Sequence, residues 1–286
     1  MFAIITIWPP HKSKNMKTII ALTNLSESSR NAVNYAADMC KALRAELLLA
    51  HVIQLPVSFD VPLTEYEYNS LQIDANKELV KIKTALLLRT NCEITISTTV
   101  MTGTILHEIE NICATKKPFL VIIATERMHW AERFVFGSNT FNSVKNLHYP
   151  VLVVPQDASF KNIERIALAS DFQDIDEVPL GFLRELVEIF DASVDIVHVN
   201  RNVEDELMSA PAFAHLKEQL KEFNPHVHFI TGYNIEQAIN DYADENKDDL
   251  VIVISRKHNF FQSLIHKSQS RQITLNPNIP VLAVAE

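Results

Sequence analysis

The sequence predicts an α/β protein made of two tandem domains, each with a doubly wound parallel sheet of five strands. One observation is an internal repeat: residues 48–52 (LLAHV) return as 195–199 (DIVHV), and 150–154 (PVLVV) return as 280–284 (PVLAV). The shift of 130–147 residues exceeds the repeat length of about 20–50 that is typical of solenoids, so the repeating unit is a whole domain. The other observation is that short apolar segments alternate with segments of helical periodicity, which favours parallel strands with helices on both faces.

The elements of the first half begin with an apolar run, Thr18–Thr23, which predicts a buried strand. Ser26–Ser29 offers N-caps for a helix, and the apolar residues of that helix recur at helical spacing: Ala32, Val33, Ala36, Ala37, Cys40 and Leu43. A second helix follows a Pro-containing loop and has its apolar side at Leu71, Ala75, Leu79, Ile82 and Leu86. After the first helix the predicted strands are Glu46–Ile53, Glu93–Met101, Phe119–Ala124 and Val151–Val154. The predicted helices are Leu71–Leu88, Ile105–Thr115 and Asn139–Leu147, and Gln54–Tyr68 is the predicted loop.

The second half repeats this order. Its predicted strands are Ile166–Ser170, Ser193–Val199, His226–Thr231, Leu250–Ile254 and Val281–Val284. Its predicted helices are Val178–Phe190, Ala212–Phe223, Ile235–Glu245 and Gln269–Leu275. We therefore expect an N-terminal extension at 1–15, domain 1 at 16–156, a linker at 157–162 and domain 2 at 163–286.

Charge is distributed unevenly over a chain of 286 residues whose net charge is −9. Residues 1–156 hold 15 Lys and Arg against 13 Asp and Glu, a net of +2, whereas residues 157–286 hold 11 against 22, a net of −11. Acidic surface repels the phosphate backbone, so nucleic acid is not an expected partner of the second half. The nearly neutral first half is the better place for a small anionic ligand; alternatively, the acidic surface mainly provides solubility.

The cysteines Cys40, Cys92 and Cys113 form no CxxC pair, which favours reduced thiols and a cytoplasmic location. A redox role is the alternative. No apolar run has the ~20 residues that a membrane span needs, so no membrane partner is expected. The apolar segment Phe2–Trp8 lacks a basic leader and ends at two prolines, which is why 1–15 is interpreted as an extension rather than a signal peptide.

The chain resembles the universal stress protein family in its tandem two-domain form. Four features carry the resemblance, and each occurs twice: the end of strand one (Thr23–Ser26, and 170–172), a second strand ending in His-Val, a Thr-Gly pair before the third helix, and a Pro-Val-Leu strand after the last helix. The resemblance implies the adenine nucleotide alpha hydrolase-like fold, with strand order 3-2-1-4-5 in each domain.

ATP-binding members of that family carry a G-x₂-G-x₉-G-[S/T] motif after strand four, and an Asp at the end of strand one holds the adenine side. Glycines let backbone approach phosphate oxygens, and the Gly-Ser pair opens a helix whose N-terminus favours an anion. In domain 1 the three glycine positions fall on Ala124, Arg127 and Gly137, followed by Ser138, and the adenine-side position is Asn24. In domain 2 they fall on Ile254, Lys257 and Lys267, followed by Ser268, while Asp171 keeps the adenine-side acid.

Neither domain has the full motif, and two interpretations follow. In the first, the protein is a stress-response regulatory or binding protein with degenerate ATP sites, no strong catalytic activity and no resident cofactor. In the second, it is a sensor that binds ATP or another nucleotide in domain 1 through Thr125, Arg127 and Ser138, because a guanidinium binds phosphate well.

Histidines give the weaker candidate sites. His51 and His198 occupy equivalent positions on apolar strands, where a packed or hydrogen-bonded role is favoured over an enzymatic one. His226 and His228 lie on one face of a strand and could form a metal pair, but no third ligand is evident in the sequence, so no metal site is predicted.

The last strand of each half, Val151–Val154 and Val281–Val284, is short, apolar and expected at a sheet edge. Exposed edges pair with other strands, and the resemblance implies that these two strands pair across a pseudo-twofold axis inside the chain. The two halves would then be the fused counterpart of a C₂ homodimer, and a homodimer of the whole chain is a further option.

Overall fold

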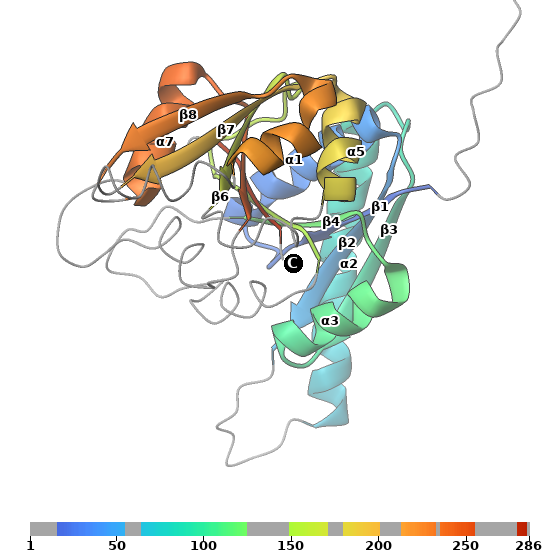
Figure 1. The fold of residues 1–286 in the computed structure, drawn as a ribbon. Coiled ribbons are helices and arrows are strands. Elements are labelled where there is room, and N and C mark those ends of the chain that lie inside the picture. The colour runs from blue at the N-terminus through green and yellow to red at the C-terminus, as the bar shows by residue number, and fades with distance from the viewer. Residues whose placement is uncertain are drawn as a thin grey trace, which may run out of the picture.

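The computed structural model describes residues 16–54, 64–124, 149–170, 180–200, 213–232, 235–254 and 279–284. Its strands form one sheet in the order β3-β2-β1-β4-β5-β10-β9-β6-β7-β8 (Figure 1). The strands of the first half are β1 (Thr18–Leu22), β2 (Glu46–Ile53), β3 (Ile96–Thr102), β4 (Leu120–Ala124) and β5 (Val151–Val154). Those of the second half are β6 (Arg165–Ser170), β7 (Ser193–Asn200), β8 (His226–Thr231), β9 (Leu250–Ile254) and β10 (Val281–Val284).

Each half of the sheet has the order 3-2-1-4-5 that was predicted, and all neighbouring strands within a half are parallel. The central strands are buried along their whole length: every residue of β1, β4, β5 and β9 is buried, and all but Thr18 are apolar. Continuous burial follows from the parallel arrangement, because crossover helices cover both faces of such a sheet.

The two halves are joined where β5 pairs antiparallel with β10. Leu152 faces Leu282 at the centre of this ladder, and Val151 and Val153 face Ala283 and Val281. The register is symmetric about the Leu152–Leu282 pair, so a pseudo-twofold axis passes through it. The expected edge-to-edge pairing inside the chain is therefore present, and it turns two five-stranded sheets into one continuous sheet.

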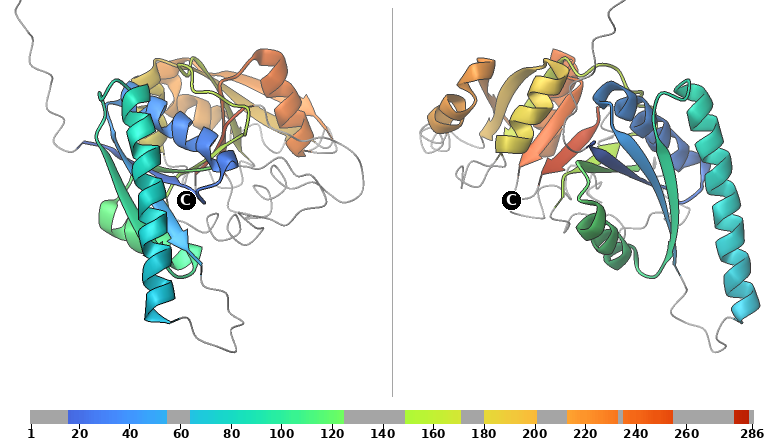
Figure 2. Two further views of the ribbon diagram at one scale, coloured as in Figure 1. Left: turned by 180° about the vertical axis from the view of Figure 1, so that it is seen from behind. Right: turned by 90° about the vertical axis from the view of Figure 1, so that its right-hand side faces the viewer.

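Helices lie on both faces of the sheet (Figure 2). One face packs on α1 (Glu27–Leu43), α2 (Glu65–Arg89), α5 (Leu180–Phe190) and the helical segment 213–219, which is followed by the short 3₁₀ helix η2 (Lys221–Phe223). The other face packs on α3 (Ile105–Lys116) and α7 (Ile235–Asn246). The predicted helices at 139–147 and 269–275 lie outside the described residues, and no described helix is long and apolar enough to cross a membrane.

The first helix follows the sequence expectation closely. Ser26 is its N-cap and accepts a hydrogen bond from the backbone N–H of Ser29. Five of the six residues of the predicted apolar stripe are buried, and Leu43 packs partly buried against the same core. At the other end the non-glycine C-cap Arg44 adopts the left-handed conformation, with φ 51°, which is a common way to end a helix.

The second helix differs from the sequence expectation at its start. It begins at Glu65 rather than Leu71, so the expected loop from Gln54 to Tyr68 ends earlier. A capping box explains the difference, since the Thr64 hydroxyl accepts from the Glu67 N–H and the Glu67 carboxylate accepts from the Thr64 N–H. Leu71 was placed on the buried side but is 43% exposed.

Replacing Thr64 with alanine should cost about 1 kcal/mol of stability, because the first turn of α2 loses its side-chain cap. Urea unfolding of the full chain would measure this, and hydrogen exchange at the Glu67 amide should accelerate. Thr84→Ala is the matched control: this threonine lies in the middle of α2 and bonds only the Val80 carbonyl, so its loss should be neutral or slightly stabilising. Equal destabilisation by both changes would contradict the capping role.

Candidate functional site

The place where a ligand is expected is the edge of the sheet formed by the carboxyl ends of β1 and β4. These strands are neighbours in the sheet, and the chain leaves β1 toward β2 on one side while β4 lies on the other. Ligands in doubly wound sheets bind at such a switch in strand order. The described residues here are the turn after β1, Thr23–Ser26, together with His51 on β2 and Ala124 at the end of β4.

The turn after β1 is closed by its own side chains. The buried Thr23 hydroxyl accepts from the Leu25 N–H at 3.0 Å and lies 2.8 Å from the Ser29 hydroxyl on α1. Leu25 has φ 65°, in the left-handed region, and this conformation turns the chain sharply into α1. The Asn24 Oδ1 atom accepts from both the backbone N–H (3.0 Å) and the hydroxyl (2.5 Å) of Ser26.

Asn24 therefore uses its carbonyl oxygen to build the turn, and its amide nitrogen is left over. Nδ2 of Asn24 is buried and has no hydrogen-bond partner in the described structure. An unsatisfied buried donor costs about 1–3 kcal/mol, so such an atom calls for an explanation. The residue at the adenine-side position therefore has no carboxylate, and its one unused polar atom is a buried N–H donor.

His51 lies beside the same turn, and its Nδ1 is hydrogen-bonded within the protein rather than free to bind a ligand. Its Nδ1 is 2.8 Å from the Thr23 carbonyl oxygen; because a carbonyl oxygen only accepts, the ring nitrogen donates. Burial lowers the pKa of His51, and the Thr23 carbonyl bond opposes that shift. His198, its counterpart in domain 2, packs edge-on against Phe213 at 5.2 Å between ring centroids. Both contacts support the packed role predicted for these residues.

The other predicted site residues divide into two groups. Asn24 and Ala124 are both described and lie at the same edge of the sheet, with Ala124 8% exposed. The remaining ones lie outside the described residues: Thr125, Arg127, Gly137, Ser138, Asp171 and Ser268. In domain 2 the first motif position, Ile254, is described; it ends β9 and is 3% exposed, so a branched side chain fills the space there.

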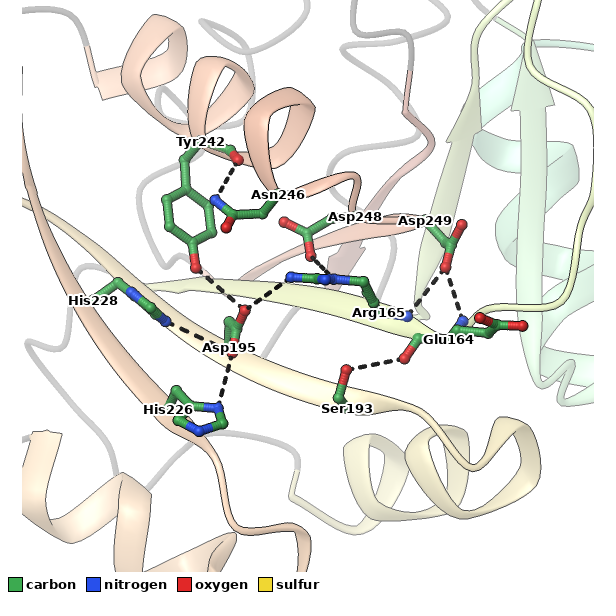
Figure 3. Close-up of polar contacts among 10 residues, drawn as sticks. All are labelled: Glu164, Arg165, Ser193, Asp195, His226, His228, Tyr242, Asn246, Asp248 and Asp249. Carbon is green, nitrogen blue, oxygen red and sulfur yellow. Dashed lines mark hydrogen bonds and ion pairs between the residues drawn. The ribbon is translucent and has the colours of Figure 1, made fainter.

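A polar cluster that the sequence analysis did not anticipate lies in domain 2, at the opposite, amino-terminal ends of the strands (Figure 3). We call it the Asp195 cluster; its members are Arg165, Asp195, His226, His228, Tyr242 and Asp248. Asp195 is the centre: its carboxylate accepts from the Tyr242 hydroxyl at 3.2 Å and lies 3.5 and 3.7 Å from the two imidazoles and 4.0 Å from the guanidinium.

Asp248 is the least satisfied member of the Asp195 cluster. Its side chain is fully buried and neither carboxylate oxygen accepts a hydrogen bond, while the nearest cation, Nε of Arg165, is 3.9 Å away. Burial raises the pKa of Asp248 to about 7, the negative charge of Asp195 adds to that shift, and Arg165 opposes it. A carboxyl group in such a place holds its proton to near-neutral pH.

The same places in domain 1 hold no charged residue. The strand registers and the repeat align Arg165 with Thr18, Asp195 with Leu48, and Asp248 with Pro118. The two histidines align with Ser97 and Thr99, and Tyr242 aligns with Ile112. Leu48 is 4% exposed and packs in the core of domain 1, so the position of the central carboxylate of the Asp195 cluster is apolar in the first domain.

The structure places a carboxylate near the possible metal pair His226 and His228, but the described residues there do not form a metal site. Asp195 lies near both rings, yet no group of three or more His, Cys, Asp or Glu side chains in the described ranges is arranged to hold a metal ion. The sequence did contain a signal for the Asp195 cluster: the repeat sets Asp195 against Leu48, an acid against an apolar residue on a buried strand.

Comparison with known proteins gives a consistent result. The model of the universal stress protein family matches residues 15–155 and again 162–285. A universal stress protein of Synechocystis is 24% identical over 295 aligned residues, which cover 93% of this chain and 99% of the relative. One from Methanocaldococcus jannaschii is 27% identical over 141 residues, covering 48% of this chain and 81% of the relative.

Among solved structures, a universal stress protein from Archaeoglobus fulgidus superposes with a TM-score of 0.71. The superposition covers 94% of this chain and 98% of that one, at 17% sequence identity. At this identity the likeness shows a shared fold, which extends over nearly the whole of both chains.

Proposed function

The chain belongs to the universal stress protein family, and from this we propose that it is a cytoplasmic stress-response regulatory or binding protein whose two ATP sites are degenerate. The observation that carries the proposal is the state of Asn24. Its carbonyl oxygen is already used by Ser26 and its Nδ2 donor is buried, so the residue at the adenine-side position of domain 1 offers no carboxylate to a ligand.

Two further observations support degenerate sites. In domain 2 the buried Ile254 side chain occupies a position where the motif needs the bare backbone of glycine. In domain 1 the corresponding Ala124 adds one methyl group, and Arg127 replaces the second glycine. We also propose no strong catalysis, because the hydrogen bond of His51 and the ring packing of His198 account for both strand-two histidines.

The second candidate function is nucleotide sensing by domain 1. The unpartnered Nδ2 atom of Asn24 favours it, since a ligand that presents an acceptor there would remove the cost of a buried free donor. Thr125, Arg127, Gly137 and Ser138 would then hold the phosphates, with ATP as the first nucleotide to test.

Isothermal titration calorimetry of the full chain with Mg-ATP distinguishes degenerate ATP sites from nucleotide sensing by domain 1. If the sites are degenerate, the wild type should show no binding heat up to about 1 mM ATP, and the variants Arg127→Ala and Ser138→Ala should show none either. Micromolar binding that is lost in both variants, but kept in the remote control Thr84→Ala, would overturn the degenerate-site proposal and establish the sensor. The variant Asn24→Asp restores the acid of the family motif and keeps an oxygen that accepts from Ser26, so it tests separately whether the missing acid prevents ATP binding.

A further inference from the structure

The β5–β10 ladder cannot by itself distinguish the two halves of the chain. Val151–Val154 and Val281–Val284 differ at one position, Val153 against Ala283, and the ladder pairs only Val, Leu and Ala. An apolar edge of this kind would pair as well with a second copy of itself. What distinguishes domain 1 from domain 2 as a partner must therefore lie outside the ladder.

One contact of this kind lies on the sheet face that α1 and α5 cover. Nζ of Lys17 lies 2.8 Å from the Glu185 carboxylate and 5.2 Å from the centre of the Phe119 ring. That ring packs on Phe182, with 5.0 Å between the two ring centroids. Lys17 and Phe119 belong to domain 1, whereas Phe182 and Glu185 lie on α5 of domain 2. We call these four residues the Lys17 contact.

The cation at the centre of the Lys17 contact is partly shielded from water. The Lys17 side chain is 26% exposed, and the rings of Phe119 and Phe182 pack partly buried against the core. A cation gains more from an aromatic face and from a carboxylate where water is partly excluded. Charge therefore contributes to this contact, in addition to the apolar packing of the two rings.

The pseudo-twofold axis gives the domain 1 residues of this contact counterparts in domain 2. The repeat aligns Lys17 with Glu164 and Phe119 with Asp249. The same backbone bonds hold both sets. The Lys17 carbonyl accepts from the first residue of β2, as the Glu164 carbonyl does from the first residue of β7. The Phe119 N–H donates to the first residue of β1, as the Asp249 N–H does to the first residue of β6. The backbone is thus repeated, while the side chains change from a cation and a ring to two acids.

The facing helix positions are repeated in the same way. Phe182 aligns with Tyr35 and Glu185 with Asp38, and α1 and α5 end at aligned residues. Asp249 acts on Tyr35 across the domain boundary: burial raises the pKa of the Tyr35 hydroxyl, and the negative charge of Asp249 adds to that shift. The two sides of the axis therefore share one geometry and differ in their charges.

Two second domains placed in this arrangement would not fit each other. Glu164 of one copy would lie against Glu185 of the other, and Asp249 would lie against Phe182. Carboxylates side by side repel, and twofold symmetry would repeat the clash on both sides of the axis. Asp249 is also engaged already, because its Oδ2 atom accepts from the Glu164 and Arg165 N–H groups at 2.9 and 3.1 Å (Figure 3).

Two first domains would gain less than the unlike pair. Lys17 of one copy would lie against Asp38 of the other, whose carboxylate already accepts from Nε and Nη2 of Arg89 at 3.0 and 2.7 Å. A carboxylate that already has a guanidinium partner attracts a further cation less. Domain 2 is therefore the better partner for Lys17.

We propose that the Lys17 contact selects the partner in domain pairing. The cation and ring of domain 1 recognise Glu185 and Phe182 on α5, and a domain that carries acids in place of Lys17 and Phe119 is rejected. Charges that oppose the wrong pair are a general source of specificity between similar surfaces. The ladder then supplies the strand pairing, and the Lys17 contact decides which domain takes part in it.

Hydrogen exchange of the full chain, measured by mass spectrometry on the β5 and β10 peptides, tests this recognition. Lys17→Glu sets two carboxylates side by side, so exchange in both peptides should rise about tenfold. Adding Glu185→Lys should bring exchange most of the way back. Two matched controls should not speed exchange: Lys41→Glu, which breaks a pair with Glu93 inside domain 1 (2.8 Å), and Glu164→Lys, which reverses the charge at the counterpart position.

A graft tests the selectivity. Lys17→Glu with Phe119→Asp gives domain 1 the acids that domain 2 carries at these positions, so exchange in β5 and β10 should rise at least about 100-fold. Exchange in β2 and β3, away from the joint, should stay slow and show that domain 1 remains folded. If the graft unfolds domain 1, the charge swap of Lys17 and Glu185 still decides, because it leaves Phe119 in place. A graft with wild-type exchange in β5 and β10, or a charge swap that recovers nothing, would overturn the proposal.

Discussion

Aspartate at both Leu152 and Leu282 is expected to separate the two halves of the molecule. These residues face each other at the centre of the β5–β10 ladder, and each is 1% exposed. Burying an unpaired carboxylate costs several kcal/mol, and like charges directly opposite each other in a sheet add to that cost. Small-angle scattering should show a larger radius of gyration than for the wild type.

Global unfolding would also expand the chain, so a matched variant is needed. Leu152→Lys with Leu282→Asp buries two charges at the same places but makes them opposite in sign. If the two strands pair, this variant should stay docked at low salt and melt at a higher temperature than the double aspartate variant. Identical melting and scattering of the two variants would contradict the pairing.

Removing the charge of Asp248 should change how stability depends on pH. The pKa of Asp248 is about 7 in the folded chain, while an unfolded aspartate has a pKa of about 3.9. Between these two values the folded state holds a proton that the unfolded state has lost, so this group lowers wild-type stability as pH rises from about 4 to 7. Above pH 7 the penalty is complete, on the order of 2–4 kcal/mol.

Asp248→Asn cannot ionise, so it should be more stable than the wild type at pH 8 and equal to it near pH 4. Thermal melts at several pH values would measure the difference, expected to reach roughly 5–10 °C at pH 8. Arg165 is not stranded by this change, because it is partly exposed and lies 4.0 Å from Asp195. Asp244→Asn, an exposed charge on α7, should shift stability by less than about 0.5 kcal/mol at every pH. A constant difference between wild type and Asp248→Asn from pH 4 to 8 would contradict the buried carboxyl.

The fold was predictable because its determinants are local and occur twice. A short apolar run such as Leu120–Ala124, set between two segments of helical pattern, is typical of a strand buried on both sides. The joint between the halves could be anticipated from the family resemblance, which implies that Val151–Val154 and Val281–Val284 pair, and from the tendency of apolar edge strands to pair. The start of α2 was missed because its signal, the reciprocal pair of Thr64 and Glu67, lies directly after a Pro-containing segment that favours a loop.

The candidate site was predictable only in part. Sequence comparison identified Asn24 as the residue at the adenine-side position, but not that Ser26 would engage its carbonyl oxygen and leave its amide nitrogen alone. That outcome depends on the turn geometry, which Leu25 sets with its positive φ. The partner of His51, the Thr23 carbonyl, comes from the neighbouring strand, and residue spacing along one strand carries no information about it.

The sequence by itself determined the duplicated scaffold and the divergence of the two halves, because periodicity and repetition are properties of the chain; the strand order came from the family resemblance. Only the tertiary structure decided which polar groups meet. Arg165, Asp195, His226 and Asp248 lie up to 83 residues apart in sequence, and the register of the four parallel strands β6 to β9 brings them together.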